Sequence, residues 1–486
     1  MSNGASTKGG RPQDAVLMLF GATGDLAKRK LLPGLFHLDV AGLMPEHYRI
    51  VGSAPAGTGT DADGFGDYVH GVLEQFGRRD VTDQAWQSFG PNLSFAPSSS
   101  DDLSELAQAV ARAEVGLDNP QRIIYLAVPP SAFLPMARAL GSAGLVNANT
   151  KLIIEKPFGS DLASARKLNE GLHEAFEESQ IYRIDHFLGK ESVQNILVFR
   201  FGNGLFEPAW HRNHLHYVQI DVPEKLNVDD RGAFYEATGA FRDMVVTHLF
   251  QLLGYLAMEP PADFDAASLH KAKLAVFEAM KPLRADHVVF GQYDGYRSVR
   301  GVAKDSTVET FVAATVTVDN ARWSGVPFYL RTGKAMAETR TTVTLGFKEP
   351  DVHMFDNDPG VSTVPCPNDL VFELSDPGSV TIRFAAKRPG PTMDVEPAAM
   401  SFRYADSFTA SNDLEAYERL LHDVMLGDHT LFNDAAGIER LWEVAAPLLE
   451  SMPTPFPYAQ GTWGPAEADR LLGSDRWYLP DDGTGD

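Results

Sequence analysis

The sequence predicts a two-domain protein: an α/β domain on a doubly wound parallel sheet, then a larger α+β domain with a mostly antiparallel sheet. Short apolar runs alternate with helical patterns through about residue 185, which is typical of parallel strands covered by helices. Beyond that point, period-two alternation indicates half-buried antiparallel strands. Because 486 residues are too many for one ordinary core, we expect domains at 1–185 and 186–486.

The first domain is predicted from short apolar runs that end at turn residues. The first run stops at a glycine and is followed by a helical pattern over 26–38, and a second, amphipathic helix is expected at 65–76. A further helix, ending near Leu140, is expected after the paired prolines at 129 and 130. The predicted strands are 16–20, 48–52, 122–128 and 151–155.

The second domain is predicted from longer segments in which apolar and polar residues alternate. Such segments favour a large sheet with one face in the core. Apolar helical patterns over 240–258 and 414–425 lie among them. The predicted strands are 215–222, 307–318, 341–347 and 379–385.

Composition excludes several classes of protein. A formal net charge of −23 argues against nucleic acid or an anionic membrane surface as the main partner. The chain has no apolar run long enough to span a membrane, and its polar N-terminus lacks the apolar segment of a secretory signal, so a cytoplasmic location is expected. The single cysteine, Cys366, is expected to be inert, and no metal site is expected.

A glycine turn follows the first predicted strand. The spacing G-x-x-G-x-x-A begins at Gly21, and a helix start follows it, so backbone N–H groups and the helix dipole can meet a pyrophosphate. Such a turn can also be purely structural, but its place as the first turn of an alternating domain favours dinucleotide binding. The predicted cofactor-binding residues of the turn are Gly21, Ala22, Thr23, Gly24, Asp25 and Leu26.

Cations near this turn and at a strand end are candidates for binding anions. Lys28, Arg29 and Lys30 oppose the helix dipole, so either they form a solvated basic face or one of them, Lys30, faces an anionic ligand. Lys156 ends the predicted strand 151–155, and ligands of parallel sheets bind at such ends. The peptide bond before Pro157 is a candidate cis bond.

Two further groups combine acids and histidines. His186 and Lys190 are four residues apart, so one helical turn would place both against a phosphate, while Asp185 is left to orient another base. Asp243 and His248 lie on an apolar helical segment, where a spacing of five is about 140° around an α-helix. On that geometry the two cannot share the centre of one face, and His248 could equally be a core histidine.

Taken together, these segments resemble the glucose-6-phosphate dehydrogenase family. They occur in the family's order along nearly the whole chain. They are GATGDLAKRKLLPGLF (21–36), AVPPS (127–131), EKPFG (155–159), YRIDHFLGKE (182–191), RDMVVTHLFQLLGYLAMEP (242–260), VPFYLRTGKAM (326–336), AYERLLHDVMLGD (416–428) and GTWGPAEAD (461–469).

The resemblance implies a role for each candidate residue. His248 corresponds to the general base that takes the C1 hydroxyl proton, and Asp185 to the carboxylate that orients it. His186 and Lys190 correspond to phosphate-binding residues, and Lys156 to a lysine where sugar and nicotinamide meet. The implied sugar-binding residues are Glu224, Asp243, Lys334 and Arg340. Arg340 lies one position beyond the place where the family often carries a basic residue.

The resemblance also implies the reaction. The expected activity is oxidation of glucose 6-phosphate at C1 to 6-phospho-D-glucono-1,5-lactone by NADP or NAD, the first step of the oxidative pentose phosphate pathway. A homodimer or homotetramer is implied. The alternatives are another two-domain sugar dehydrogenase and a dinucleotide-binding paralogue without turnover, which activity with glucose 6-phosphate distinguishes.

Three positions depart from the family pattern. Phe187 replaces a tyrosine in the phosphate segment, and Thr339 stands where a basic residue is common, with Arg340 next to it. Pro55 stands where NADP-using members often carry an arginine after the second strand. NADP remains the expected cofactor because most of the family uses it. Because 53–66 contains no Lys or Arg, we expect NAD to be accepted as well, unless Arg49 or a distant residue supplies the charge.

Overall fold

The computed structural model describes all residues except 1–9, 353–354, 356–367, 376–377, 409–413 and 480–486. Cys366 and the two chain ends therefore lie outside the described residues. The chain forms two compact units: the first comprises residues up to 190 with 263–270 and 412–439, and the second comprises 191–262, 271–411 and 440–486. The predicted domain division at 185/186 remains a prediction.

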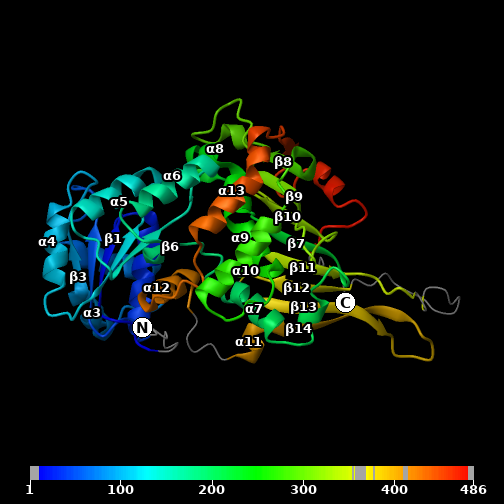
Figure 1. Ribbon diagram of the computed structural model, residues 1–486, viewed down its shortest axis with the longest axis horizontal. Helices are drawn as coiled ribbons and strands as arrows, with labels where there is room; N and C mark the ends of the chain where they lie inside the picture. Colours follow the sequence, from blue (N-terminus) through cyan, green and yellow to red (C-terminus); the bar gives the residue numbers. More distant parts are fainter. Residues whose placement is uncertain (1–9, 353–354, 356–367, 376–377, 409–413, 480–486) are drawn as a thin grey trace. The chain divides into compact units, whose positions relative to one another are not determined.

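The first unit is built on a six-stranded parallel sheet of order β3-β2-β1-β4-β5-β6, as predicted (Figure 1). All six residues of β1 are buried, because helices cover both faces of such a sheet. This strand order is that of dinucleotide-binding folds, which bind their ligand at the carboxyl ends of the strands. The strands are β1 (Ala15–Phe20), β2 (Tyr48–Ser53), β3 (Leu93–Phe95), β4 (Gln121–Leu126), β5 (Thr150–Ile154) and β6 (Ile181–Arg183).

Helices of the first unit pack around a core that includes alternate residues of β1, namely Ala15, Leu17 and Leu19. Helix α1 packs against α2 and α12, and α5 packs against α6. The helices are η1 (Ala27–Leu31, a π-helix), α1 (Leu32–Val40), α2 (Phe65–Phe76), α3 (Asp83–Phe89), α4 (Ser104–Ala113), α5 (Phe133–Ser142), α6 (Leu162–His173) and α12 (Ala416–Leu426).

The second unit is built on a nine-stranded, mostly antiparallel sheet of order β14-β13-β12-β11-β7-β10-β9-β8-β15, again as predicted (Figure 1). Two pairs, β7 with β10 and β8 with β15, are parallel. The strands are β7 (Leu215–Pro223), β8 (Val288–Tyr293), β9 (Phe311–Thr317), β10 (Pro327–Gly333), β11 (Thr342–Phe347), β12 (Asp369–Glu373), β13 (Ser379–Lys387), β14 (Val395–Arg403) and β15 (Phe456–Tyr458).

The helices of the second unit include a nine-residue π-helix, η7. They are α7 (Glu191–Phe201), α8 (Gly232–Ala240), η7 (Phe241–Leu249), α9 (Phe250–Ala257) and α11 (Tyr404–Ser407), while α10 (Ala266–Ala279) and α13 (Ala435–Glu450) have residues in both units. The short 3-10 helices of the chain are η2 (Gly90–Asn92), η3 (Pro130–Ala132), η4 (Glu178–Gln180), η5 (Glu207–Ala209), η6 (Asp229–Arg231), η8 (Ala285–His287), η9 (Tyr296–Ser298) and η10 (Ala466–Leu471). Among the described helices, none has the length and hydropathy needed to cross a membrane.

The predicted elements differ from the observed ones in two ways. The strands that were not predicted are β3, β6, β8, β10, β12, β14 and β15. In addition, the helical repeat changes within two predicted helices. The helix expected at 26–38 opens with the π-helix η1, and the one expected at 240–258 contains η7. In a π-helix each N–H bonds the carbonyl five residues back. Accordingly, Leu32 donates to the carbonyl of Ala27, and Phe250 to that of Val245.

Candidate functional site

The glycine turn after β1 has the predicted geometry. Gly21 has φ of +72°, and a Cβ there would lie 2.1 Å from the carbonyl oxygen of Ala127, so no other residue fits without movement. Gly24 donates its N–H to the Gly21 carbonyl at 2.8 Å, which closes the turn just before the helix begins. The first N–H groups of that helix have no intrahelical acceptor. This cradle fits a pyrophosphate.

The three cations after the turn have three different partners. Arg29 pairs with Asp25 at 2.7 Å, and Lys30 pairs with Glu415 at 2.9 Å. Lys28 lies 5.9 Å from the ring centroid of Tyr68. An anionic ligand would therefore have to compete with the Glu415 carboxylate for Lys30.

A cavity of about 490 Å³ lies beside the loop that follows β2. Asp61 and Tyr68 line it together with three glycines and a threonine, and no lysine or arginine is among these residues. Arg49 does not supply the missing charge, because its guanidinium donates to Asn92 and to the carbonyl of Tyr48 near the start of β2. The cavity thus offers a carboxylate and hydroxyl groups, and Lys28 Nζ lies 5.9 Å from the ring centroid of Tyr68, one of its lining residues.

Lys156 follows β5 at the carboxyl edge of the sheet, as predicted, and the peptide bond to Pro157 is cis. Beside it, the Glu155 carboxylate accepts a hydrogen bond from the Tyr125 hydroxyl at 2.5 Å and another from Tyr417. Burial raises the pKa of Glu155 to about 7, against the lowering effects of both tyrosines and of Lys156, while nearby Asp185 raises it further.

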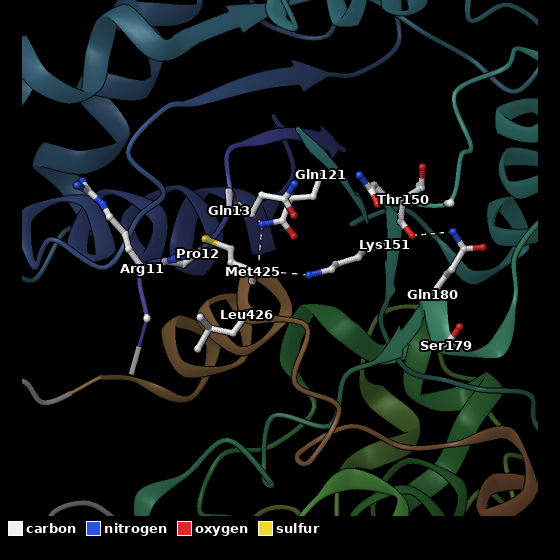
Figure 2. Close-up of a pocket in the computed structure, with 13 residues that line it drawn as sticks. Arg11, Pro12, Gln13, Gln121, Thr150, Lys151, Ser179, Gln180, Met425 and Leu426 are labelled. Carbon is white, nitrogen blue, oxygen red and sulfur yellow. Dashed lines mark hydrogen bonds between the residues drawn. The ribbon is translucent and has the colours of Figure 1, made fainter. Parts of the chain in front are cut away.

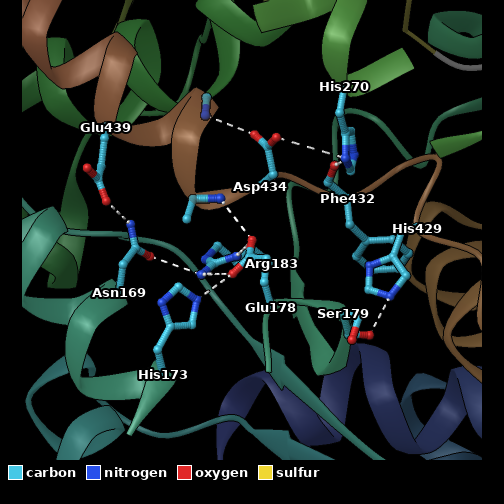
Figure 3. A network of polar contacts seen from close by, with 12 residues as sticks. Asn169, His173, Glu178, Ser179, Arg183, His270, His429, Phe432, Asp434 and Glu439 are labelled. Carbon is cyan, nitrogen blue, oxygen red and sulfur yellow. Dashed lines mark hydrogen bonds and ion pairs between the residues drawn. The ribbon is translucent and has the colours of Figure 1, made fainter. Parts of the chain in front are cut away.

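Asp185 emerges beside Glu155 because β5 and β6 are adjacent parallel strands in which Ile154 pairs with Arg183. The fully buried Arg183 anchors this strand end (Figure 3). Its guanidinium donates to Glu178 at 2.6 and 3.0 Å and to Asn169 at 3.0 Å.

The segment after β6 is a turn rather than the helical turn that we predicted, because α7 begins only at Glu191. Asp185, which is 2% exposed, accepts the N–H of Phe187 at 3.0 Å and so fixes the turn. The His186 ring lies parallel to the Tyr417 ring, with centroids 6.0 Å apart, and Lys190 Nζ lies 5.0 Å from the Phe187 ring. The His186 ring also lies edge-on to the Phe187 ring, with centroids 5.2 Å apart, so His186 and Lys190 both contact Phe187.

In the second unit, two predicted sugar-binding residues come together at strand ends. Glu224 follows β7 and Lys334 follows β10; these strands are parallel, and Pro223 pairs with Gly333. Lys334 donates to the Glu224 carboxylate, and the Glu224 N–H donates to the carbonyl of Gly333 at 2.9 Å. The pair presents one positive and one negative group at the same edge.

The π-helix η7 corrects our expectation for Asp243 and His248. Five residues are about 140° apart in an α-helix, but a π-helix closes its hydrogen bonds over five residues and stacks i and i+5 on one face. Both side chains are buried, with Asp243 8% and His248 1% exposed. The sequence argument was wrong here because it assumed the ordinary helical repeat.

The start of η7 is fixed by Gly239 and Glu309. Gly239 has φ of +70° and breaks the preceding helix, and a Cβ there would lie 2.3 Å from the Glu309 carboxylate. That carboxylate accepts the N–H of Phe241 at 3.0 Å. Burial raises the pKa of Glu309 to about 7, against the opposing effect of the Phe241 N–H.

Tyr235 is a candidate residue that sequence reasoning missed. It is 3% exposed, and its hydroxyl has no hydrogen-bond partner among the described residues. Burial, followed by the charges of Asp243 and Glu309, raises its pKa well above the ordinary value, and Lys334 Nζ lies 5.8 Å from its ring centroid. A buried hydroxyl normally has a partner, so this one is available to a ligand.

Arg340 is less well placed for a ligand than the other predicted residues of this unit. Its backbone N–H donates to the carbonyl of Pro223, near Glu224, but its guanidinium pairs with Glu373 and lies 4.0 Å from Glu338. Thr339, which stands at the position where a basic residue was expected, accepts the N–H of Lys225.

Two family domains of known proteins match successive parts of the chain. The family domain “Glucose-6-phosphate dehydrogenase, NAD binding domain” matches residues 18–195, and “Glucose-6-phosphate dehydrogenase, C-terminal domain” matches residues 197–478. The glucose-6-phosphate 1-dehydrogenase of Mycolicibacterium smegmatis is 39% identical over 95% of this chain and 97% of its own. Glucose-6-phosphate 1-dehydrogenase 2 of Mycobacterium tuberculosis is 38% identical over 94% and 92%.

Solved structures agree with these matches. A crystal structure of glucose-6-phosphate 1-dehydrogenase from Mycobacterium avium has a TM-score of 0.86 and 34% identity, covering 97% of this chain and 99% of its own. A glucose-6-phosphate dehydrogenase solved with its substrate glucose 6-phosphate has a TM-score of 0.88 and 30% identity over the same shares. The chain therefore belongs to the glucose-6-phosphate dehydrogenase family.

Proposed function

We propose a specific role for each residue group in the family's reaction. The chain is an oxidoreductase that converts glucose 6-phosphate to 6-phospho-D-glucono-1,5-lactone with a nicotinamide dinucleotide. The observation that carries the assignment of roles is the π-helix η7, which gives the buried His248 and Asp243 a common face. A buried imidazole and a buried carboxylate on one face of a helix suit proton transfer and the binding of hydroxyl groups.

The proposed base is His248. Its neutral imidazole takes the proton of the C1 hydroxyl as hydride leaves the same carbon. The proposed partner, Asp185, orients the ring and stabilises the imidazolium that forms. Support for Asp185 is its burial and its fixed position in the turn after β6, where it accepts the Phe187 N–H.

The proposed phosphate-binding residues are His186 and Lys190. Both belong to the turn at the carboxyl edge of the parallel sheet, where anionic ligands of such sheets bind. Phe187 removes one hydroxyl donor relative to the family pattern, so Lys190 supplies a charge-assisted contact and the His186 imidazole a further hydrogen bond.

Glu224, Asp243 and Lys334 are proposed to bind the sugar hydroxyls, and Tyr235 is added to them. Support for Tyr235 is its buried hydroxyl, which has no hydrogen-bond partner within the part of the chain that the structure describes, and its ring, whose centroid lies 5.8 Å from Lys334 Nζ. Arg340 remains a weaker proposal because its guanidinium is paired with Glu373.

For the cofactor, the residues 21–26 of the glycine turn are proposed to hold the pyrophosphate, and Lys156 to lie near the nicotinamide. When bound, the nicotinamide ring supplies the hydride acceptor. We propose that NAD is accepted alongside NADP, because Asp61 and not a cation lines the cavity after β2. The kcat/KM ratio of NADP over NAD is then expected to stay below about 10³, or roughly 4 kcal/mol.

Pro55→Arg tests the proposed cofactor preference. A guanidinium that pairs with the 2′-phosphate is worth about 1.5–3 kcal/mol, so the NADP/NAD ratio should rise roughly ten- to a hundredfold. Asp61→Asn is the matched control, since it removes the carboxylate without adding a cation. A wild-type ratio above 10³ would contradict NAD use.

The function itself is tested by following reduction of the dinucleotide with glucose 6-phosphate and with glucose. Turnover that requires the 6-phosphate is expected. Equal kcat/KM for glucose would support the other two-domain sugar dehydrogenases, and reduction of neither cofactor would support a non-catalytic paralogue. A cytoplasmic homodimer or homotetramer is also proposed, on the family resemblance alone.

A further inference from the structure

Helix α12 belongs to the first unit although it lies far along the chain from the other elements of that unit. Its 11 residues span about 16 Å, and so do the five residues of β5, so the helix is long enough to reach from one edge of the parallel sheet to the other. The α12 residues that share the core with β1 are Leu420, Leu421, Val424 and Met425.

The carboxyl end of α12 is bonded to residues at the amino ends of two strands (Figure 2). Lys151, the second residue of β5, donates its Nζ to the carbonyl of Val424 at 2.6 Å and to that of Met425 at 3.3 Å. Gln121, the first residue of β4, donates to the Met425 carbonyl at 3.0 Å. Carbonyls of a last helical turn lack intrahelical donors, and a cation there also suits the helix dipole. The two side chains thus fix this end of α12 to the sheet.

The amino end of α12 lies against the turn 185–190, which carries the proposed phosphate-binding residues and is called the phosphate turn below. Gly189 approaches so closely that a Cβ there would lie 2.7 Å from the carbonyl oxygen of Ala416. Because Gly189 does not have a positive φ, the close approach and not the backbone conformation requires glycine here. Tyr417 lies parallel to the His186 ring and hydrogen-bonds Glu155. The helix therefore meets the phosphate turn at two points.

We propose that α12 positions the phosphate turn, and that Lys151, at the opposite edge of the sheet, is a positioning residue that acts through this helix. A helix that is fixed at one end holds its other end in place, because its hydrogen bonds keep the spacing of its residues constant. Loosening the carboxyl end should let Ala416 and Tyr417 move, and with them Gly189 and His186. The effect on substrate binding rests on the phosphate role proposed for His186 and Lys190.

Lys151→Met, made in the full chain, removes the donor to α12. Amide hydrogen exchange in the phosphate turn, followed by mass spectrometry, should become at least about threefold faster. KM for glucose 6-phosphate should rise about two- to tenfold, while kcat and KM for the dinucleotide stay at wild-type values. The rise is modest because Arg78 still binds Glu418, near the amino end, at 2.6 Å. Lys151→Arg keeps donors for both carbonyls and should restore both readouts.

Arg122→Met is the matched control. Arg122 lies next to Lys151 in the sheet, since Ile123 pairs with Lys151, and its guanidinium binds Glu114 at 2.6 Å. None of its hydrogen bonds within the described part of the chain reaches α12. The variant should lower the thermal midpoint and leave the exchange of the phosphate turn and both KM values unchanged. Equal effects in Arg122→Met, or unchanged exchange in Lys151→Met, would overturn the proposal.

Gly189→Ala tests the same contact from the other side. The added Cβ forces the phosphate turn away from Ala416, so KM for glucose 6-phosphate should rise more than in Lys151→Met. Once this contact is broken, adding Lys151→Met should raise KM by less than it does alone, because coupled residues are not additive. Full additivity of the two changes would mean that Lys151 does not act through α12, and would overturn its role.

Lys190→Thr separates this proposal from the proposed function. If Lys190→Thr leaves KM for glucose 6-phosphate unchanged, the phosphate role fails, while faster exchange of the phosphate turn in Lys151→Met still supports positioning by α12. If Lys190→Thr raises that KM and Lys151→Met does not, positioning by Lys151 is overturned. In a sample without turnover, the calorimetric Kd for glucose 6-phosphate gives the same comparison.

Discussion

The two units hold their predicted site residues in different ways. In the first unit, Lys156, His186 and Lys190 lie after strand ends and contact rings and neighbouring charges. In the second unit, Asp243 and His248 are buried in a π-helix whose first N–H is bonded to the buried Glu309. The difference teaches that cations suited to binding an anion can remain near solvent, while proton transfer needs a fixed, water-free position. Changes in the first unit should mainly raise KM, and changes in η7 should mainly lower kcat.

The largest effect is expected from His248→Asn. Loss of a general base typically costs about 10²–10⁴-fold in rate, and KM for glucose 6-phosphate should change little. Steady-state kinetics measures both. His37→Asn is the matched control, because His37 is also a buried histidine, 3% exposed, but pairs with Glu418; its kcat per folded molecule should be normal. Retention of more than about a tenth of kcat in His248→Asn would exclude the role.

Asp185→Asn tests the proposed orienting carboxylate, a residue of the first unit that is buried as Asp243 and His248 of η7 are. The amide sets the imidazole tautomer wrongly, so kcat should fall by about 10²-fold or more while both KM values stay close to wild type. The pH profile of kcat should change as well. A variant that is less stable but turns over normally per folded molecule would make Asp185 purely structural.

Lys190→Thr should act on binding. A charge-assisted contact to phosphate is worth about 1.5–3 kcal/mol, so KM for glucose 6-phosphate should rise roughly ten- to a hundredfold. KM for the dinucleotide serves as the internal control and should not move. Equal increases in both constants would place Lys190 at the cofactor.

A smaller change is expected from Tyr235→Phe. The ring and its packing remain, and a single hydrogen bond to a sugar hydroxyl is lost, so kcat/KM should fall about two- to tenfold. Tyr296→Phe is the matched control, since the hydroxyl of that buried tyrosine already donates to Glu236 at 3.0 Å. If the two variants have the same kcat/KM, Tyr235 does not contact substrate.

The smallest effect concerns stability and compares the buried glutamates of the two units. Burial raises the pKa of Glu155 and of Glu309 to about 7 in the folded protein. At pH values between the unfolded pKa near 4.5 and the folded pKa of about 7, the folded state binds more protons than the unfolded state. The stabilisation from these two glutamates is therefore complete below pH 4.5 and is lost as the pH rises toward 7. The pKa of Glu155 is lowered by Tyr125, Lys156 and Tyr417 and raised by Asp185. The pKa of Glu309 is lowered by Arg242.

Thermal unfolding midpoints between pH 5 and pH 8 measure this effect. The midpoint should fall with pH less steeply in Glu155→Gln and in Glu309→Gln than in the wild type. Glu309→Gln should also lower kcat, because the amide is a weaker acceptor for the Phe241 N–H that begins η7. Wild-type steepness in both variants would mean that neither glutamate titrates in this range.

Sequence patterns predicted both sheets and the glycine turn because those features depend on short-range order: apolar alternation, and a glycine directly after a strand. The strand register that brings Glu224 to Lys334 was not predictable, since it joins residues 110 positions apart. The three-residue strands β3, β6 and β15 were missed because three residues give too little alternation to detect. The longer strands β8, β10, β12 and β14 were not predicted either.

The repeat of η7 was the main error of the sequence argument. The apolar pattern over 240–258 indicated a helix, but the first N–H of η7 is bonded to Glu309, 68 residues from Phe241, and no local pattern shows that contact. The ion pair between Lys30 and Glu415 could not be predicted either, because the two residues are 385 positions apart in the sequence. Glu155 and Tyr417 lie inside segments that carried the family resemblance, yet no local pattern showed that they meet.

The most direct test of the proposed reaction uses glucose 6-phosphate deuterated at C1. After turnover by the wild-type chain, mass spectrometry of the reduced dinucleotide should show one deuterium per molecule, transferred from the sugar. Reduced dinucleotide without deuterium, or no reduction at all, would contradict oxidation at C1.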